Sequence, residues 1–179
     1  MVRLFVAIDL PQEVREVLRS SQQELRKSRA RLSVVRPENI HITLKFIGEV
    51  EEDAVVAIKE RLAGISGSPF EVSVSGIAAD NRRRPRVVWC TIIDGGKCAD
   101  LNEQIEEALL PLGIQKESRR FRPHATLARV KKFDPSLLDS IRPMESAEYG
   151  NFLVDGFTLK KSTLTPSGAI YEDMMAVNW

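Results

Sequence analysis

Two histidines, His41 and His124, each begin the same short phrase, His-x-Thr-Leu, and the 179-residue chain contains no others. On a β-strand, residues i and i+2 point to the same side, so His41 would lie beside Thr43 and His124 beside Thr126. An imidazole with a pKa of about 6.5 gives or takes a proton near neutral pH. Threonine hydroxyls donate hydrogen bonds to phosphate oxygens. Two such pairs facing each other would suit general base and general acid in an in-line displacement at phosphorus.

Both phrases fall on predicted strands. Residues 40–46 are apolar at 40, 42, 44 and 46 and polar at 41, 43 and 45, which predicts a strand with one face in a core. Gly48 is predicted to end this strand, and Lys45, on the same side as His41, is expected at a solvated edge. A second strand is predicted from residue 121 to about 130.

Three other interpretations compete with a paired catalytic site. A lone histidine is usually structural, but by composition both histidines fall into this phrase by chance with a probability on the order of 10⁻⁵. Zinc would need a third and fourth ligand, for which the sequence has no recognisable spacing. Cys90 lies in an apolar strand, where a buried and inert thiol is expected rather than a nucleophile.

The composition predicts one globular domain over residues 1–179, with a hydrophobic content of 43%. No stretch approaches the ~20 apolar residues of a membrane span. The apolar run at residues 2–8 is too short for a signal peptide, and Asp9 and Pro11 interrupt it. With only two cysteines, a disulfide framework is not expected, so we expect a reduced, cytoplasmic protein. We also expect a monomer.

The net charge is only +1, but the basic residues cluster. Four arginines lie within residues 82–86, and the stretch 115–132 carries seven basic residues against one acid, Glu117. Such clusters suit a phosphate backbone, and we expect the 82–86 loop to contact RNA there. Arg122 has the strand parity of His124 and is a candidate substrate contact. Arg129 has the opposite parity and would reach the site only if the strand is bulged or ends.

Period and turn signals predict the remaining elements. Helices are expected from Pro11, with Val14, Val17, Leu18 and Leu25 inward, over 51–63, from Asp100 to 112, and over 135–141. Further strands are expected at 3–9, 31–35, 70–76, 87–93, 149–164 and 169–177. Each motif strand follows an Arg-Pro pair, which suggests a duplication. We therefore predict an α+β fold of two related, intertwined lobes, with mostly antiparallel sheet, helices outside and an active-site groove between the lobes.

The paired phrases resemble the two signature motifs of the 2H phosphoesterase superfamily. The wider chain is similar to its RNA 2′,3′-cyclic phosphodiesterase branch, historically called 2′-5′ RNA ligases. The resemblance runs through residues 3–11, 37–49, 85–89, 121–130 and 162–171. It implies a bilobal fold with a pseudo-twofold axis, in which the two motifs face each other across a central groove.

The resemblance also implies an activity: hydrolysis of an RNA terminal 2′,3′-cyclic phosphate to a 2′-phosphate, with neither metal nor cofactor. His41 would protonate the departing 3′ oxygen, His124 would accept a proton from water, and Thr43 and Thr126 would hold the phosphate. The partner would be RNA with a cyclic phosphate end, with tRNA fragments as one source. Alternatives are 2′-5′ ligation or 2′,5′-phosphodiester cleavage at the same site, or an RNA-binding protein without turnover. If both rings serve one phosphate, their nearest nitrogens should be roughly 5–9 Å apart.

Overall fold

The computed structural model describes residues 1–179. It contains four α-helices, α1 (Gln12–Arg26), α2 (Ala54–Ala63), α3 (Lys97–Leu109) and α4 (Ser136–Ile141). Its nine strands are β1 (Val2–Asp9), β2 (Arg31–Val34), β3 (His41–Val50), β4 (Phe70–Ala79), β5 (Val87–Ile93), β6 (His124–Lys132), β7 (Glu148–Val154), β8 (Gly156–Thr165) and β9 (Gly168–Asn178). No helix is long and apolar enough to span a membrane.

All nine strands belong to one sheet, in the order β7-β4-β5-β6-β3-β1-β8-β9, with β2 paired to β6. Every strand pair is antiparallel. The predicted α+β fold with a mostly antiparallel sheet is therefore confirmed. A single hydrophobic core of 35 buried residues underlies both ends of the sheet.

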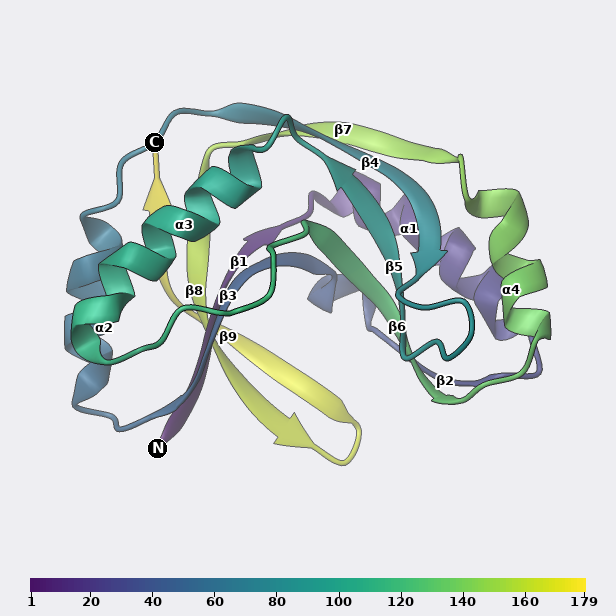
Figure 1. The fold of residues 1–179 in the computed structure, drawn as a ribbon, viewed down its shortest axis with the longest axis horizontal. Coiled ribbons are helices and arrows are strands. Elements are labelled where there is room, and N and C mark those ends of the chain that lie inside the picture. The colour runs from purple at the N-terminus through teal and green to yellow at the C-terminus, as the bar shows by residue number, and fades with distance from the viewer.

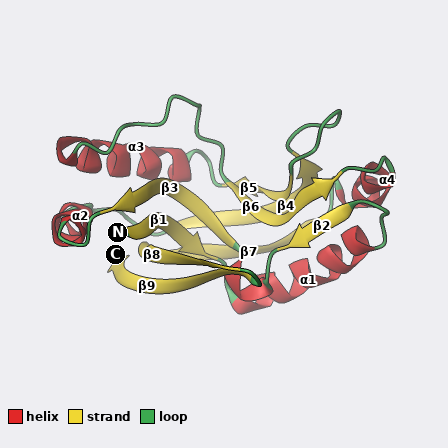
Figure 2. Cartoon of the chain, turned by 90° about the horizontal axis from the view of Figure 1, so that it is seen from below, coloured by secondary structure: helices red, strands yellow, loops and turns green.

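The sheet divides into two halves that meet where β3 pairs with β6 (Figure 1). One half holds β1, β3, β8 and β9 with α2 and α3, and the other holds β2 and β4–β7 with α1 and α4. Figure 2 shows the two pairs of helices at opposite ends of the molecule. The chain crosses repeatedly between the halves: α1 follows β1 into the second half, and α3 returns to the first. The halves are therefore intertwined lobes of one sheet.

The prediction that Gly48 ends β3 is wrong. The strand continues to Val50, and Gly48 adopts a φ of 87° beside an irregular pairing with β1. Leu4 pairs with Gly48 and Phe5 with Phe46, so Ile47 is an extra, bulged residue. Glycine tolerates this left-handed conformation, and the strand passes through a bulge where a turn was expected.

The predicted strand over residues 149–164 is two strands, β7 and β8, interrupted at Asp155. β7 pairs with β4 in one half of the sheet, whereas β8 pairs with β1 in the other. At Gly156, a Cβ atom would lie 2.0 Å from the carbonyl oxygen of Val177. Because only glycine permits this approach, the Asp-Gly pair marks the point where the chain changes halves.

Helix α3 begins at Lys97, earlier than the Asp100 start expected from the sequence. The Asp94 carboxylate accepts hydrogen bonds from the amides of Gly96, at 3.1 Å, and Cys98, at 2.6 Å. The bond from Cys98 satisfies a free N–H group of the first turn, which the N-cap residue Gly96 has no side chain to reach. The Asp94 carboxylate, two residues before the N-cap, therefore supplies the capping acceptor.

The buried face of α1 is more polar than predicted. Val17, expected to face inward, is 47% exposed, while Ser21 and Gln22 are only 3% exposed. Gln22 is buried because its side chain bonds to the sheet beneath the helix. This contact reaches the second motif strand, as described below.

Candidate active site

The two motif strands meet at one ladder pair, Ile42 with Ala125. In an antiparallel pair this register sets His41 opposite Thr126 and Thr43 opposite His124. Ile42 and Ala125 are fully buried, and the four motif side chains, on the other face of the strands, are half-buried. These four side chains form the motif face. The two histidines lie on a diagonal of the pairing, with Cα atoms about 7–8 Å apart.

A β-bulge follows each His-x-Thr phrase. In β3, Thr43 pairs with Ala7 and Lys45 with Val6, which leaves Leu44 as an extra residue. In β6, Thr126 pairs with Trp89 and Ala128 with Val88, which leaves Leu127 extra. After each bulge, the following side chains point to the opposite side of the sheet from the one that simple alternation predicts. The two strands share this deviation.

Side-chain amides from the helices hold both bulges. Asn102 of α3 donates from Nδ2 to the Leu44 carbonyl oxygen at 2.7 Å. Gln22 of α1 donates from Nε2 to the Leu127 carbonyl at 3.1 Å and to the Val35 carbonyl at 2.7 Å. A bulge disturbs the ladder locally, and these donors satisfy carbonyls beside it. Each motif strand is thus fixed by a helix of its own lobe, which sequence reasoning did not foresee.

The second bulge turns Arg129 to the motif face. Ala128 is buried beside Leu127, and Arg129 is exposed on the opposite side. The extra residue, Leu127, sets Arg129 on the side of the strand to which Thr126 points. The sequence predicted that Arg129 would reach the site only if its strand was bulged or ended, and this bulge is present.

Lys45 lies in the core, and its expected position at a solvated edge is wrong. Because of the bulge at Leu44, its side chain is only 2% exposed. Its Nζ lies 3.0 Å from Oε1 and 2.8 Å from Oε2 of Glu106, and it donates to the Gln115 carbonyl at 2.8 Å. Glu106 Oε1 also accepts from the amide of Glu117. Through these bonds the ion pair holds the backbone at the start of the basic stretch 115–132, which contains His124.

The two rings are oriented in the same way. Nδ1 of His41 lies 2.7 Å from the Asn39 carbonyl oxygen, and Nδ1 of His124 lies 2.8 Å from that of Arg122. A carbonyl only accepts, so Nδ1 carries hydrogen in both rings and Nε2 is left for proton exchange. Nε2 of His41 is 2.9 Å from Thr43 Oγ1.

Arg122 takes part here through its backbone, and its side chain is exposed. β6 begins at His124, so residues 121–123 lie outside the strand that was predicted to include them. The parity by which Arg122 was expected to face the site therefore does not apply.

Aromatic rings flank both imidazoles. The Phe5 and Tyr171 ring centroids lie 5.0 and 5.4 Å from that of His41, and Trp89 lies 4.4 Å from His124. Sequence reasoning placed Trp89 and Tyr171 on strands without assigning them to the site. The usable signal was weak: each is the single aromatic residue of its strand. Burial lowers the pKa of His41, although the Asn39 carbonyl and Asp9 act in the opposite direction.

Other candidate chemistry lies elsewhere or is suppressed. Burial raises the pKa of the Cys90 thiol to about 12, so the nucleophilic thiolate is scarce at neutral pH. No three His, Cys, Asp or Glu side chains lie close enough to form a metal-binding cluster. In the 82–86 loop, Arg82 forms an ion pair with Glu145 at 2.7 Å.

The antiparallel sheet of intertwined lobes, with one His-x-Thr strand from each, is the architecture of a two-histidine phosphoesterase. The family model described as LigT-like phosphoesterase matches residues 8–89 and 95–171. The chain belongs to this family, and it is a phosphoesterase.

Known proteins of this kind are similar over almost the full length. An RNA 2′,3′-cyclic phosphodiesterase of Archaeoglobus fulgidus is 38% identical over 97% of this chain and 98% of its own. An RNA 2′,3′-cyclic phosphodiesterase of Aeropyrum pernix is 39% identical over 82% of this chain and 85% of its own. The crystal structure of E. coli LigT complexed with 3′-AMP superposes with a TM-score of 0.80 at 25% identity, covering 99% of this chain and 97% of that one. A crystal structure from Thermus thermophilus gives a TM-score of 0.84 at 28% identity, covering 98% and 97%.

Proposed function

We propose that this protein hydrolyses the terminal 2′,3′-cyclic phosphate of RNA to a 2′-phosphate, with His41 and His124 as the acid–base pair. The observation that carries the proposal is the motif face, where two imidazoles and two threonine hydroxyls lie on one side of a single strand pair. The relatives named RNA 2′,3′-cyclic phosphodiesterase support the substrate.

In the proposed step, the water oxygen bonds to phosphorus while the bond from phosphorus to O3′ breaks. His124 Nε2 takes the proton from water, and His41 Nε2 gives a proton to O3′, so both charges and protons balance. The phosphate stays on O2′. Thr43 and Thr126 would donate to the non-bridging oxygens, whose charge grows in the transition state, and Arg129 would offset that charge. Arg122 supports His124 through its carbonyl.

The lowered pKa of His41 favours its neutral form at pH 7 when no substrate is bound. An acid must be protonated to act, so this form suits the proposed role only after substrate has bound. The cyclic phosphate carries a negative charge, and a negative charge beside an imidazole raises its pKa. Substrate binding would thus create the acid. The folded unit over residues 1–179 would act as a monomer, in the cytoplasm, on RNA ends such as those of tRNA fragments.

Hydrolysis with identification of the product tests this function. An oligonucleotide ending in a 2′,3′-cyclic phosphate, incubated with the protein and EDTA, is expected to acquire a 2′-phosphate end, which phosphorus NMR distinguishes from a 3′-phosphate. A 3′-phosphate product, or activity restored only by added metal, would contradict the proposed step. With a 5′-hydroxyl RNA also present, ligation exceeding hydrolysis would favour 2′-5′ joining instead.

A further inference from the structure

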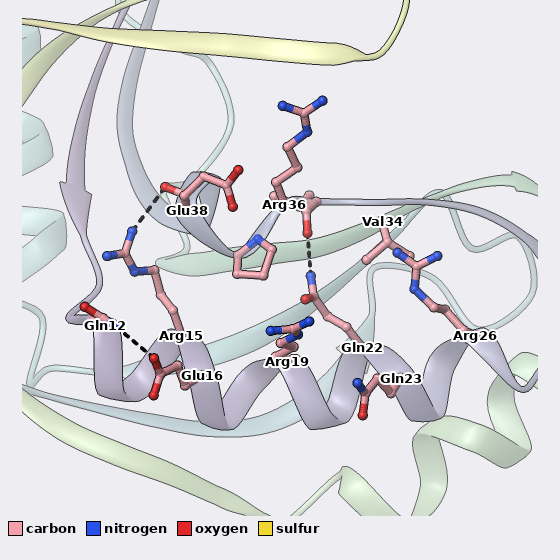
Figure 3. Close-up of a pocket in the computed structure, with 12 residues that line it drawn as sticks. Gln12, Arg15, Glu16, Arg19, Gln22, Gln23, Arg26, Val34, Arg36 and Glu38 are labelled. Carbon is pink, nitrogen blue, oxygen red and sulfur yellow. Dashed lines mark hydrogen bonds between the residues drawn. The ribbon is translucent and has the colours of Figure 1, made fainter.

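A hollow in the surface lies outside the motif face, between α1 and residues 34–38 (Figure 3). Its volume is about 710 Å³, and only 2 of its 12 lining residues are hydrophobic. A pocket for an apolar ligand is lined mainly by hydrophobic and aromatic side chains. This hollow therefore suits a polar or charged ligand.

Four arginines line the hollow: Arg15, Arg19 and Arg26 along one face of α1, and Arg36 on the opposite rim. None of the four forms an ion pair, whereas Arg29, Arg82 and Arg142 each pair with a carboxylate elsewhere. The two acids of the lining do not neutralise them. Glu16 accepts a hydrogen bond from Gln12, and Glu38 contacts Arg15 through its backbone carbonyl, at 3.2 Å. The hollow holds a surplus of positive charge suited to an anion.

The hollow adjoins the first motif. Glu38 lines it, and three residues later His41 begins β3, so their Cα atoms are at most about 11 Å apart. A strand of nucleic acid covers that distance in about three nucleotides. The short turn Pro37–Asn39 connects the two places, and its Asn39 carbonyl orients the His41 ring.

We propose that this arginine hollow binds phosphates of the RNA chain on the 5′ side of the cyclic end, an inference that rests on the proposed function. Guanidinium groups bind phosphate oxygens through paired, charge-assisted hydrogen bonds. Such contacts position a nucleic acid without reading its sequence. The hollow would therefore give the enzyme a preference for oligonucleotides over mononucleotides, independent of the terminal base.

The test compares two double variants of equal charge. Arg19→Gln with Arg26→Gln removes two arginines of the hollow, and Arg29→Gln with Arg142→Gln removes two that pair elsewhere. Substrates are adenosine 2′,3′-cyclic phosphate and an oligoadenylate ending in the same group. For the hollow variant, the ratio of kcat/KM for oligonucleotide over mononucleotide is expected to fall about tenfold at low salt, and the slope of log affinity against log salt to weaken by about 1.4. The control variant should retain both.

A ratio unchanged in the hollow variant, or lowered equally in the control, would overturn the proposal. Fluorescence anisotropy with a labelled oligoadenylate ending in a 3′-hydroxyl measures RNA affinity without hydrolysis. It therefore tests the phosphate site separately from the proposed function. If neither substrate is hydrolysed by the parent protein, the function fails, while a selective loss of RNA affinity in the hollow variant still supports the phosphate site. Undiminished RNA affinity in the hollow variant would overturn the phosphate site.

Discussion

Replacing His124 with alanine is expected to lower kcat for cyclic phosphate hydrolysis by about 10²–10⁴-fold, and His41→Ala to do the same. Each imidazole exchanges one proton in the proposed step, and no other titratable side chain is hydrogen-bonded to either ring. The rings are half-buried at the surface of the sheet, so truncation should leave the fold intact. Steady-state kinetics on a cyclic-phosphate oligonucleotide measures the loss.

Binding measurements on the same variants distinguish a catalyst from a binder. Affinity for the oligonucleotide should remain within a few-fold of the parent, because arginines and threonines supply most of the phosphate contacts in the proposed site. Unchanged circular dichroism and melting temperature exclude unfolding as the cause. A loss of only about twofold in kcat for either variant would remove that histidine from the mechanism.

The second large effect concerns the Lys45–Glu106 pair. Lys45→Met leaves the Glu106 carboxylate, only 4% exposed, without its counter-ion. Removing one partner of a buried ion pair costs about 3–5 kcal/mol, which for a domain of this size lowers Tm by about 6–20 °C. Thermal unfolding followed by circular dichroism measures this change. The position of the second motif should also change, because Lys45 and Glu106 hydrogen-bond to the backbone of Gln115 and Glu117, ahead of His124.

Two companion variants make this result specific. Lys45→Met combined with Glu106→Leu removes both charges and is expected to recover most of the lost stability. Lys116→Met is the matched control, since Lys116 is partly exposed and pairs with the exposed Glu103 on the same helix as Glu106, and its Tm should stay close to that of the parent. A single Lys45→Met variant as stable as the parent would show that the buried charge is not needed.

Much of the site could be predicted because a strand repeats every two residues. The phrases at His41 and His124 require only that alternation to place each threonine beside its histidine, and the buried Ile42 and Ala125 behind them fit it. The α+β class followed from the same periodicity. These features are local, so the sequence contains what is needed to predict them.

The features that could not be predicted depend on distant parts of the chain. Simple alternation fails at Leu44 and Leu127, where pairing with β1 and β5 inserts a bulge, and Lys45 turns inward as a result. Gln22 and Asn102 reach those bulges from helices whose orientation no local pattern reveals. Tyr171 meets His41 only because β9 pairs with β8, which pairs with β1 beside β3. The joining of the two lobes into one sheet, through β3 and β6, likewise depends on pairing between residues far apart in the chain.

The most direct test of a shared phosphate site observes the two imidazoles themselves. Because the chain has only two histidines, a long-range proton–nitrogen correlation spectrum resolves both rings without ambiguity. On titration with adenosine 2′-monophosphate, both rings should shift with one common Kd, and the pKa of His41 should rise from its lowered value in the free protein. A response from one ring alone, or two different Kd values, would contradict a single phosphate held between them.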